Sequence, residues 1–226
     1  APTGPAKNLM GIPWRVAFAL QADGWNLRQD IIWAKPNPMP ESVTDRCTKS
    51  HEYIFLFSKS QKYFFNAEAI SEPVAETTIA RCKQNIENQK GSKRVSGKDA
   101  PMKAVLPRYW GKKYTEDPSK FFRTKSGRMY DIGDGRRNKR SVWTVATVPF
   151  REAHFATFPP ELIRPCILAG CPVNGTVLDP FFGSGTTGVV CTQENRRYIG
   201  IEINRDYVQI AKRRIEAVER TGRLMI

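Results

Sequence analysis

The stretch L-D-P-F-F-G-S-G-T-T-G, residues 178–188, decides the fold of this chain. It carries three glycines at the G-x-G-x-x-G spacing, namely Gly183, Gly185 and Gly188. A glycine-rich turn of this kind leads from a strand into a helix and lets a ligand approach the backbone closely. The spacing alone is met in many chains, so its meaning depends on the flanking residues.

The flanking sequence alternates between strand and helix patterns. We expect a strand at 175–179, a helix at 186–192, a strand at 197–202 and a last amphipathic helix at about 204–219. Strands that are joined through helices pair in parallel. The sequence therefore predicts an α/β fold with a Rossmann-like sheet and helices on both faces.

An acid stands at the end of each of these two strands, Asp179 and Glu202. The two phosphates of a dinucleotide would be repelled by an unpaired Asp179 carboxylate, whereas the ammonium and sulfonium of S-adenosylmethionine would be attracted. An acid placed like Glu202 accepts hydrogen bonds from ribose hydroxyls. The predicted cofactor is S-adenosylmethionine, and the alternative is a purely structural glycine turn. A phosphate loop of the G-x-x-x-x-G-K-[ST] type is absent from the sequence.

Regular elements upstream of the glycines are separated by proline-rich breaks. We expect a helix at 12–21, a strand at 27–34 that ends at K-P-N-P-M-P, a strand at 52–58, a possible hairpin partner at 62–66, and a helix at 159–170. The continuous apolar run at 52–58 is typical of a strand that is buried on both faces. Pro165 fits awkwardly inside the last helix.

The middle of the chain is strongly basic. The net charge of the chain is +14, and residues 76–140 contain 18 Lys or Arg against seven Asp or Glu. We interpret residues 71–140 as a basic insertion that contacts nucleic-acid phosphates, between domains at 1–70 and 141–226. The alternative is a solvated or partly disordered insertion, because the segment is also rich in Gly, Ser, Asn and Gln.

Cysteine usage and hydropathy indicate a reduced, cytoplasmic protein. The five cysteines form no C-x-x-C pair, so no structural zinc or other metal is expected. No apolar run reaches the roughly 18 residues of a membrane span, and no secretory signal segment is visible.

Several ordered blocks together resemble the amino-methylating DNA methyltransferases. These blocks are I-P-W-R-V-A-F-A-L, D-I-I-W-A-K-P-N-P-M-P-E, H-E-Y-I-F-L-F-S-K, H-F-A-T-F-P-P-E-L-I, D-P-F-F-G-S-G-T-T-G and R-R-Y-I-G-I-E-I-N-R-D-Y. Their order is similar to that of the permuted group, in which the catalytic half precedes the cofactor-binding half. The resemblance covers roughly residues 8–66 and 138–219. It implies methyl transfer from S-adenosylmethionine to adenine N6 or cytosine N4 of double-stranded DNA, in bacterial or phage restriction-modification.

The resemblance also implies roles for particular residues. The cofactor would be held by Asp179, Phe181, Gly183, Gly185, Thr187 and Glu202, and its methionine end by Thr157, Phe158 and Pro159. The DNA would be contacted by Lys35, Asn37, Lys112, Lys113, Arg136 and Arg137, the last four from the basic, target-recognising insertion. For Lys35 the alternative is an ordinary solvated lysine.

The family's catalytic tetrapeptide, an acid or serine followed by Pro-Pro and an aromatic residue, does not occur in the chain. We therefore assign no catalytic residue. The resemblance implies that this motif lies before Ala1, on a central strand of the sheet. Without that strand the ladder groups of its neighbours would be unpaired, so we expect a longer chain or a second chain to complete the sheet.

Rival interpretations follow from single residues and from the missing motif. Pro165-Cys166 is the dipeptide of a cytosine-C5 nucleophile, but Cys166 falls on an apolar helix face and is expected to be a core residue. His154 is expected to have a packing role instead of serving as a general base. A nucleic-acid-binding protein that keeps this scaffold without its chemistry, and a nicotinamide-dependent oxidoreductase, remain as alternatives.

Overall fold

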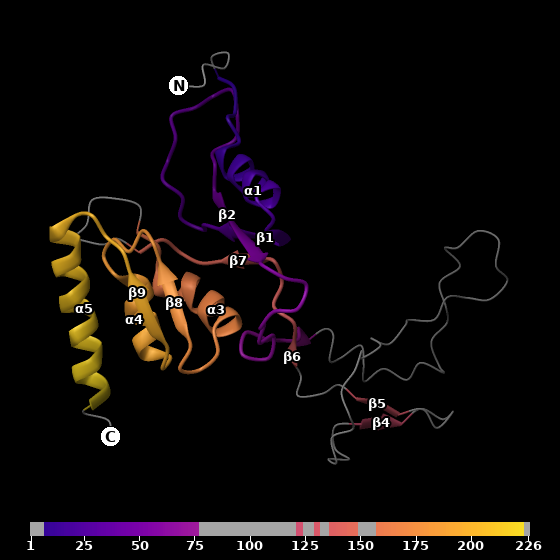
Figure 1. Ribbon diagram of the computed structural model, residues 1–226. Helices are drawn as coiled ribbons and strands as arrows, with labels where there is room; N and C mark the ends of the chain where they lie inside the picture. The colour runs from indigo at the N-terminus through magenta and orange to yellow at the C-terminus, as the bar shows by residue number, and fades with distance from the viewer. Residues whose placement is uncertain (1–6, 77–120, 124–128, 132–135, 149–156, 224–226) are drawn as a thin grey trace. The chain divides into compact units, whose positions relative to one another are not determined.

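The computed structural model describes residues 7–76, 121–123, 129–131, 136–148 and 157–223 (Figure 1). The chain divides into two compact units, one formed by Ala1–Ile70 with Arg140–Ile226 and the other by Ser71–Lys139. Lys112, Lys113 and His154 lie outside the described residues. Within the described part, no helix combines the length and hydropathy that a membrane crossing requires.

The expected strand-helix-strand-helix unit is present near the C-terminus. It consists of β8 (Thr176–Asp179), α4 (Thr186–Gln193), β9 (Arg197–Gly200) and α5 (Arg205–Arg223). β8 and β9 pair in parallel, with Asp179 opposite Gly200. The ladder continues one step further, because the N–H of Ile201 donates to the carbonyl of Asp179 at 2.9 Å. The acids at the two strand ends therefore stand at the same edge of the sheet.

Helix α3 (Pro160–Gly170) connects two apolar clusters. On one cluster Leu162 packs with Ile31, Trp33 and Trp143, and on the other Ile167 packs with Val190 and Cys191 of α4. Pro165 lies inside the helix, which continues through it. An interior proline costs about 3 kcal/mol, and burial of side chains in two clusters offsets that cost.

The cysteines of these helices are core residues. Cys166 is half-buried and packs against the cluster of Trp33 and Trp143, with its Sγ 3.9 Å from the Leu162 carbonyl oxygen, as expected for a residue on the apolar face of this helix. Cys191 of α4 is fully buried, and burial raises the pKa of its thiol to about 11. That thiol is protonated at neutral pH and is no nucleophile.

A three-stranded sheet has the order β2-β1-β7. Its strands are β1 (Asn26–Ala34), β2 (His51–Ser58) and β7 (Val142–Thr144). β2 is antiparallel to β1, with an irregularity between Leu27 and Gln29, and β7 is parallel to β1. Helix α1 (Ile12–Ala22) packs on β2 through Trp14, whose ring centre lies 5.5 Å from that of Tyr53 and 5.0 Å from that of Phe55.

Two expectations for β2 are wrong. Residues 62–66 form no strand, and Tyr63, Phe64 and Phe65 remain 38–47% exposed; the described partner of β2 is β1. β2 is also half-buried instead of buried on both faces. Ile54 packs on one side and Trp14 on the other, but neither covers the strand completely.

The described strands form separate ladders. Besides β2-β1-β7 and β8-β9 there are β3 (Glu72–Pro73) with β6 (Arg136–Arg137), and β4 (Phe121–Arg123) with β5 (Met129–Asp131), both in the Ser71–Lys139 unit. One face of β8-β9 is apolar and open, since Leu178, Ile199 and Ile201 are 55–60% exposed. Parallel strands are ordinarily covered on both faces.

Candidate functional site

The glycine loop, residues 180–185, carries the chain from the end of β8 to the start of α4. Gly183 and Gly185 have φ angles of 52° and 77°, in the left-handed region that favours glycine. Gly185 caps the N-terminus of α4, and its N–H donates to the carbonyl of Phe182 at 2.9 Å. The backbone path of the loop therefore requires glycine at these two positions.

Asp179 fastens this loop to the end of β8. Its Oδ1 accepts the N–H of Phe181 at 3.0 Å, and its Oδ2 accepts the hydroxyl of Thr187 at 2.6 Å. An ionised carboxylate offers about four lone-pair positions, so the acid can still accept bonds from a cationic ligand. The structure thus brings together Asp179, Phe181 and Thr187, three of the expected cofactor residues.

Glu202, two residues beyond β9, fastens the same loop from the second strand. Its Oε2 accepts the N–H of Gly183 at 2.8 Å, and its Oε1 accepts the N–H of Asn204 at 2.7 Å. Glu202 is half-buried. Both acids at this edge of the sheet therefore accept hydrogen bonds from the backbone of the glycine loop, Asp179 from Phe181 and Glu202 from Gly183.

Phe182 forms an apolar floor beneath the loop. Its ring stacks on Tyr198, with centres 5.6 Å apart and an interplanar angle of 10°. A Cβ added to Gly188 would lie 2.7 Å from the ring of Phe182, and one added to Gly200 would lie 2.4 Å from it. Phe181 is 88% exposed. Phe181 was among the predicted cofactor residues and Phe182 was not, although glycines at 188 and 200 were the available sign of a ring packed closely there.

The start of α4 buries three polar side chains, Ser184, Thr186 and Thr187, at 4–6% exposure. Arg214 of α5 reaches two of them from behind. Its Nη1 donates to the carbonyl of Ser184 at 2.6 Å, to the hydroxyl of Ser184 at 2.9 Å and to the hydroxyl of Thr186 at 3.2 Å. These bonds satisfy polar groups that would otherwise be buried without partners. Arg214 was not among the residues predicted from the sequence.

The second expected cofactor block leads into α3. Pro159 is buried and caps that helix, Phe158 packs against the cluster of Trp33 and Trp143, and Thr157 is half-buried. The predicted contact of this block with the methionine end of the cofactor stays a prediction.

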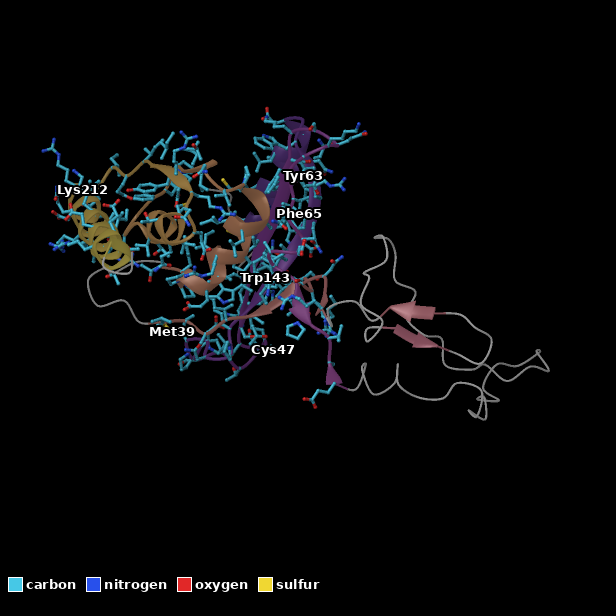
Figure 2. The ribbon with its side chains drawn as sticks, turned by 90° about the horizontal axis from the view of Figure 1, so that it is seen from below. Met39, Cys47, Tyr63, Phe65, Trp143 and Lys212 are labelled. Carbon is cyan, nitrogen blue, oxygen red and sulfur yellow. The ribbon has the colours of Figure 1, made fainter. Side chains whose placement is uncertain are left out.

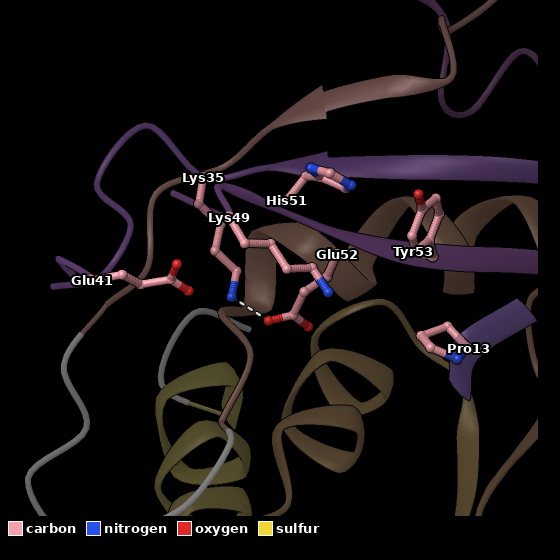
Figure 3. A pocket seen from close by; sticks show the side chains of 7 residues that line it. All are labelled: Pro13, Lys35, Glu41, Lys49, His51, Glu52 and Tyr53. Atoms are coloured by element: carbon pink, nitrogen blue, oxygen red, sulfur yellow. Dashed lines mark hydrogen bonds and ion pairs between the residues drawn. The ribbon is translucent and has the colours of Figure 1, made fainter. Parts of the chain in front are cut away.

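A polar pocket of about 340 Å³ lies where β1 ends and β2 begins (Figure 3). It is lined by Pro13, Lys35, Glu41, Lys49, His51, Glu52 and Tyr53. The Nζ of Lys35 pairs with the carboxylate of Glu52 and lies 4.4 Å from the centre of the Trp33 ring. The side chain of Lys35 is only 20% exposed. Lys35 is thus a partly buried cation at a pocket, with an aromatic face beside it.

Asn37 has a supporting position instead. Its Nδ2 donates to the carbonyl of Thr147 at 3.1 Å, and its Oδ1 accepts the N–H of Thr147 at 2.9 Å. The side-chain amide therefore ties the loop after β1 to the segment after β7. The predicted contact of Asn37 with DNA stays a prediction.

Arg136 and Arg137 form β6 of the Ser71–Lys139 unit. The Nε of Arg137 lies 3.0 Å from Oε1 of Glu72, and the Nε of Arg136 donates to the hydroxyl of Ser71 at 2.6 Å. Both guanidinium groups brace β6 against the strand β3 or the residue before it. Their predicted contact with DNA stays a prediction.

Comparison with known proteins gives the geometry its context. The sequence matches the model of the DNA methylase family (N6/N4 methyltransferases) over residues 5–213. The Type II methyltransferase M.XycI of Xanthomonas campestris pv. cyanopsidis is 46% identical over 210 residues, which make up 93% of this chain and 51% of that protein. The chain thus spans about half the length of this curated relative.

Solved structures share the fold. The PvuII DNA methyltransferase (cytosine-N4-specific) matches with a TM-score of 0.57 at 16% identity, over 97% of this chain and 64% of that one. The M1.HpyAVI–SAM complex matches with a TM-score of 0.53 at 22% identity, over 92% and 71%. These likenesses confirm the predicted α/β methyltransferase fold. Since the family match covers most of its residues, the chain belongs to the DNA methylase family of N6/N4 methyltransferases.

Proposed function

We propose that this protein is a site-specific methyltransferase for double-stranded DNA, which moves a methyl group from S-adenosylmethionine to N6 of adenine or N4 of cytosine. The observation that carries the proposal is the glycine loop bound by Asp179 and Glu202, the acids that end two neighbouring parallel strands. Relatives that match most of this chain are named Type II methyltransferases, and a protein of similar fold was solved as a SAM complex. The proposed place of action is the bacterial cytoplasm, where such DNA lies.

The residues at the loop suit a cofactor that carries both positive charge and a nucleoside. Asp179 can attract the ammonium and sulfonium charges, and Glu202 can accept from ribose hydroxyls. The exposed ring of Phe181 and the open space over Gly183 leave room for an adenine. If bound there, S-adenosylmethionine would supply an electrophilic methyl group to the amino nitrogen of the target base, with S-adenosylhomocysteine as the leaving group and one amino proton released, so that no covalent enzyme intermediate would be needed. The chain contributes position and acceptors.

We further propose that additional strands complete the sheet, contributed by more of the same protein or by a second chain. Among the described strands β8 pairs only with β9, and the apolar side chains of Leu178, Ile199 and Ile201 are 55–60% exposed. Covering these residues would stabilise the sheet by about 25 cal/mol for each Å² of apolar area buried. In the permuted order, the catalytic tetrapeptide that is absent from residues 1–226 would lie on one of those strands, before residues 1–70.

The test compares this chain with a form extended to the length of its relatives. We expect saturable binding of S-adenosylhomocysteine, and none of NAD, by calorimetry with either form. We expect transfer of labelled methyl groups to mixed-sequence DNA only with the extended form. Failure to bind S-adenosylhomocysteine would overturn the cofactor assignment. Binding of cofactor and DNA without transfer by the extended form would favour a protein that keeps the scaffold and has lost the chemistry.

On the DNA side we propose that the Lys35 pocket receives the target nucleotide or its phosphate, and that Ser71–Lys139 is the target-recognition region. Lys35 is a cation with a low exposure whose present partner, Glu52, is 53% exposed and can be exchanged. In the extended form, Lys35→Met should weaken DNA binding for all sequences and reduce the salt slope by about 1.

Glu52→Gln is the matched variant, because it removes the partner and leaves Lys35 charged. It should tighten DNA binding or leave it unchanged. Filter binding over a range of salt concentrations measures both variants. An unchanged salt slope in Lys35→Met would place the lysine outside the DNA path.

A further inference from the structure

Helix α5 shapes the glycine loop through three residues on one of its faces, Ala211, Arg214 and Ile215. Ala211 and Ile215 are 2% and 5% exposed. A Cβ on Gly185 would meet the Cβ of Ala211 at 2.6 Å, and one on Gly188 would meet Cδ1 of Ile215 at 2.7 Å. Residues three and four apart share a helix face, so Arg214 lies on the face of α5 that packs closely against Gly185 and Gly188.

Arg214 is therefore aimed at the loop by the packing around it. One guanidinium nitrogen makes three hydrogen bonds, to both oxygens of Ser184 and to the hydroxyl of Thr186. A cation near the N-terminus of a helix is disfavoured by the helix dipole, so the charge of Arg214 does not stabilise α4 as such. What the arginine offers the loop is its specific hydrogen bonds to Ser184 and Thr186.

The loop is consequently held from two sides. At the strand ends, Asp179 and Glu202 bind the N–H groups of Phe181 and Gly183. From the α5 side, Arg214 binds the carbonyl and hydroxyl groups of the next residues along the loop. Loss of the Arg214 hydrogen bonds alone would leave Asp179 and Glu202 in place. It would, however, release the backbone at residues 184–186, which sets the positions of Gly183 and Gly185.

We propose that Arg214 is a positioning residue for the cofactor, which acts by holding residues 184–186 in the binding geometry. The proposal rests on the proposed function, since it assumes that the glycine loop binds S-adenosylmethionine. Arg214 would act through its hydrogen bonds to Ser184 and Thr186. Its loss therefore raises the Kd and KM for the cofactor more than it lowers kcat, because a bound cofactor restores the loop geometry at the expense of binding energy.

The experiment measures S-adenosylhomocysteine binding by calorimetry for Arg214→Met and Arg214→Lys. The control is Lys212→Met, an exposed position on the same helix (Figure 2). We expect Arg214→Met to weaken binding by about tenfold or more, since charged hydrogen bonds are lost. Arg214→Lys should recover part of the affinity, and Lys212→Met should stay within about twofold of the unaltered protein.

Hydrogen exchange of the amides at 183–187, measured well below the melting temperature, separates positioning from global stability. We expect faster exchange there in Arg214→Met, with little change in β1 or β2. Unaltered affinity and exchange in a folded Arg214→Met would overturn the proposal. So would an equal rise in exchange across all the elements, which indicates general destabilisation. Absence of S-adenosylhomocysteine binding in the unaltered protein would instead count against the proposed function.

Discussion

The Gly185→Ala variant is expected to lose about 2–5 kcal/mol of folding stability, which lowers the melting temperature by on the order of 10 °C. Two effects add. The φ angle of 77° strains any residue with a Cβ, and that Cβ would lie 2.6 Å from the Cβ and 3.0 Å from the Cα of Ala211. The second contact is with backbone, so it can be relieved only by moving α5. Thermal unfolding followed by circular dichroism measures the loss.

Gly183→Ala is the matched control. Its φ angle is 52°, but an added Cβ would meet nothing closer than the Phe181 carbonyl oxygen at 4.0 Å. We expect this variant to lose only about 1–2 kcal/mol, from strain alone. The added Cβ projects into the open space over the loop, where the cofactor is proposed to bind. We therefore expect the loss of binding free energy for S-adenosylhomocysteine to exceed the loss of folding free energy. Equal stability losses in the two variants would contradict the packing of α5 against Gly185.

Asp179→Ala is expected to reduce S-adenosylhomocysteine affinity by about a hundredfold or more while the protein still folds. The change removes a negative charge from the site. It also removes the acceptor of two hydrogen bonds, which are donated by the N–H of Phe181 in the loop and by the hydroxyl of Thr187 in α4. Hydrogen bonds to charged groups contribute about 1.5–3 kcal/mol each. Calorimetric titration measures the affinity.

Two further variants separate the effect of the Asp179 charge from that of its hydrogen bonds to Phe181 and Thr187. Thr187→Val removes one hydrogen bond and keeps the charge, so it should cost about tenfold or less. Asp179→Asn keeps one acceptor oxygen and removes the charge. If Asp179→Asn binds S-adenosylhomocysteine as tightly as the unaltered protein does, attraction of the ligand's ammonium group is not the role of this acid, and its hydrogen bonds to Phe181 and Thr187 account for its effect.

Sequence patterns predicted the cofactor half of the fold well because its determinants are local. Strand, glycine turn and helix follow one another within residues 175–193, and each is specified by its own periodicity. The acids Asp179 and Glu202 end their strands, so parallel pairing alone brings them to one edge. The roles of Phe182 and Arg214 could not be predicted from local periodicity or strand pairing, because their contacts depend on how α5 and the glycines pack in three dimensions.

The pairing of distant segments was equally invisible. Asn37 binds a residue 110 positions away, and Arg136 binds one 65 positions away. No local pattern encodes such partners. The hairpin expectation for residues 62–66 was wrong because an apolar run next to β2 suggests a strand, whereas these residues form none and β2 pairs with the preceding strand β1.

Helix α3 has a thermodynamic consequence through the two clusters that it joins. Leu162 belongs to the cluster around Trp33, and Ile167 to the cluster around Val190. If α3 lost its contacts with one cluster, the apolar side chains on that face of the helix would become exposed. Because the other cluster packs against the same helix, we expect the two clusters to unfold together. A cofactor that binds only the folded glycine loop then raises the stability of both. Trp33 and Trp143 are 5% and 6% exposed, so their fluorescence reports ligand-induced stabilisation from outside the loop.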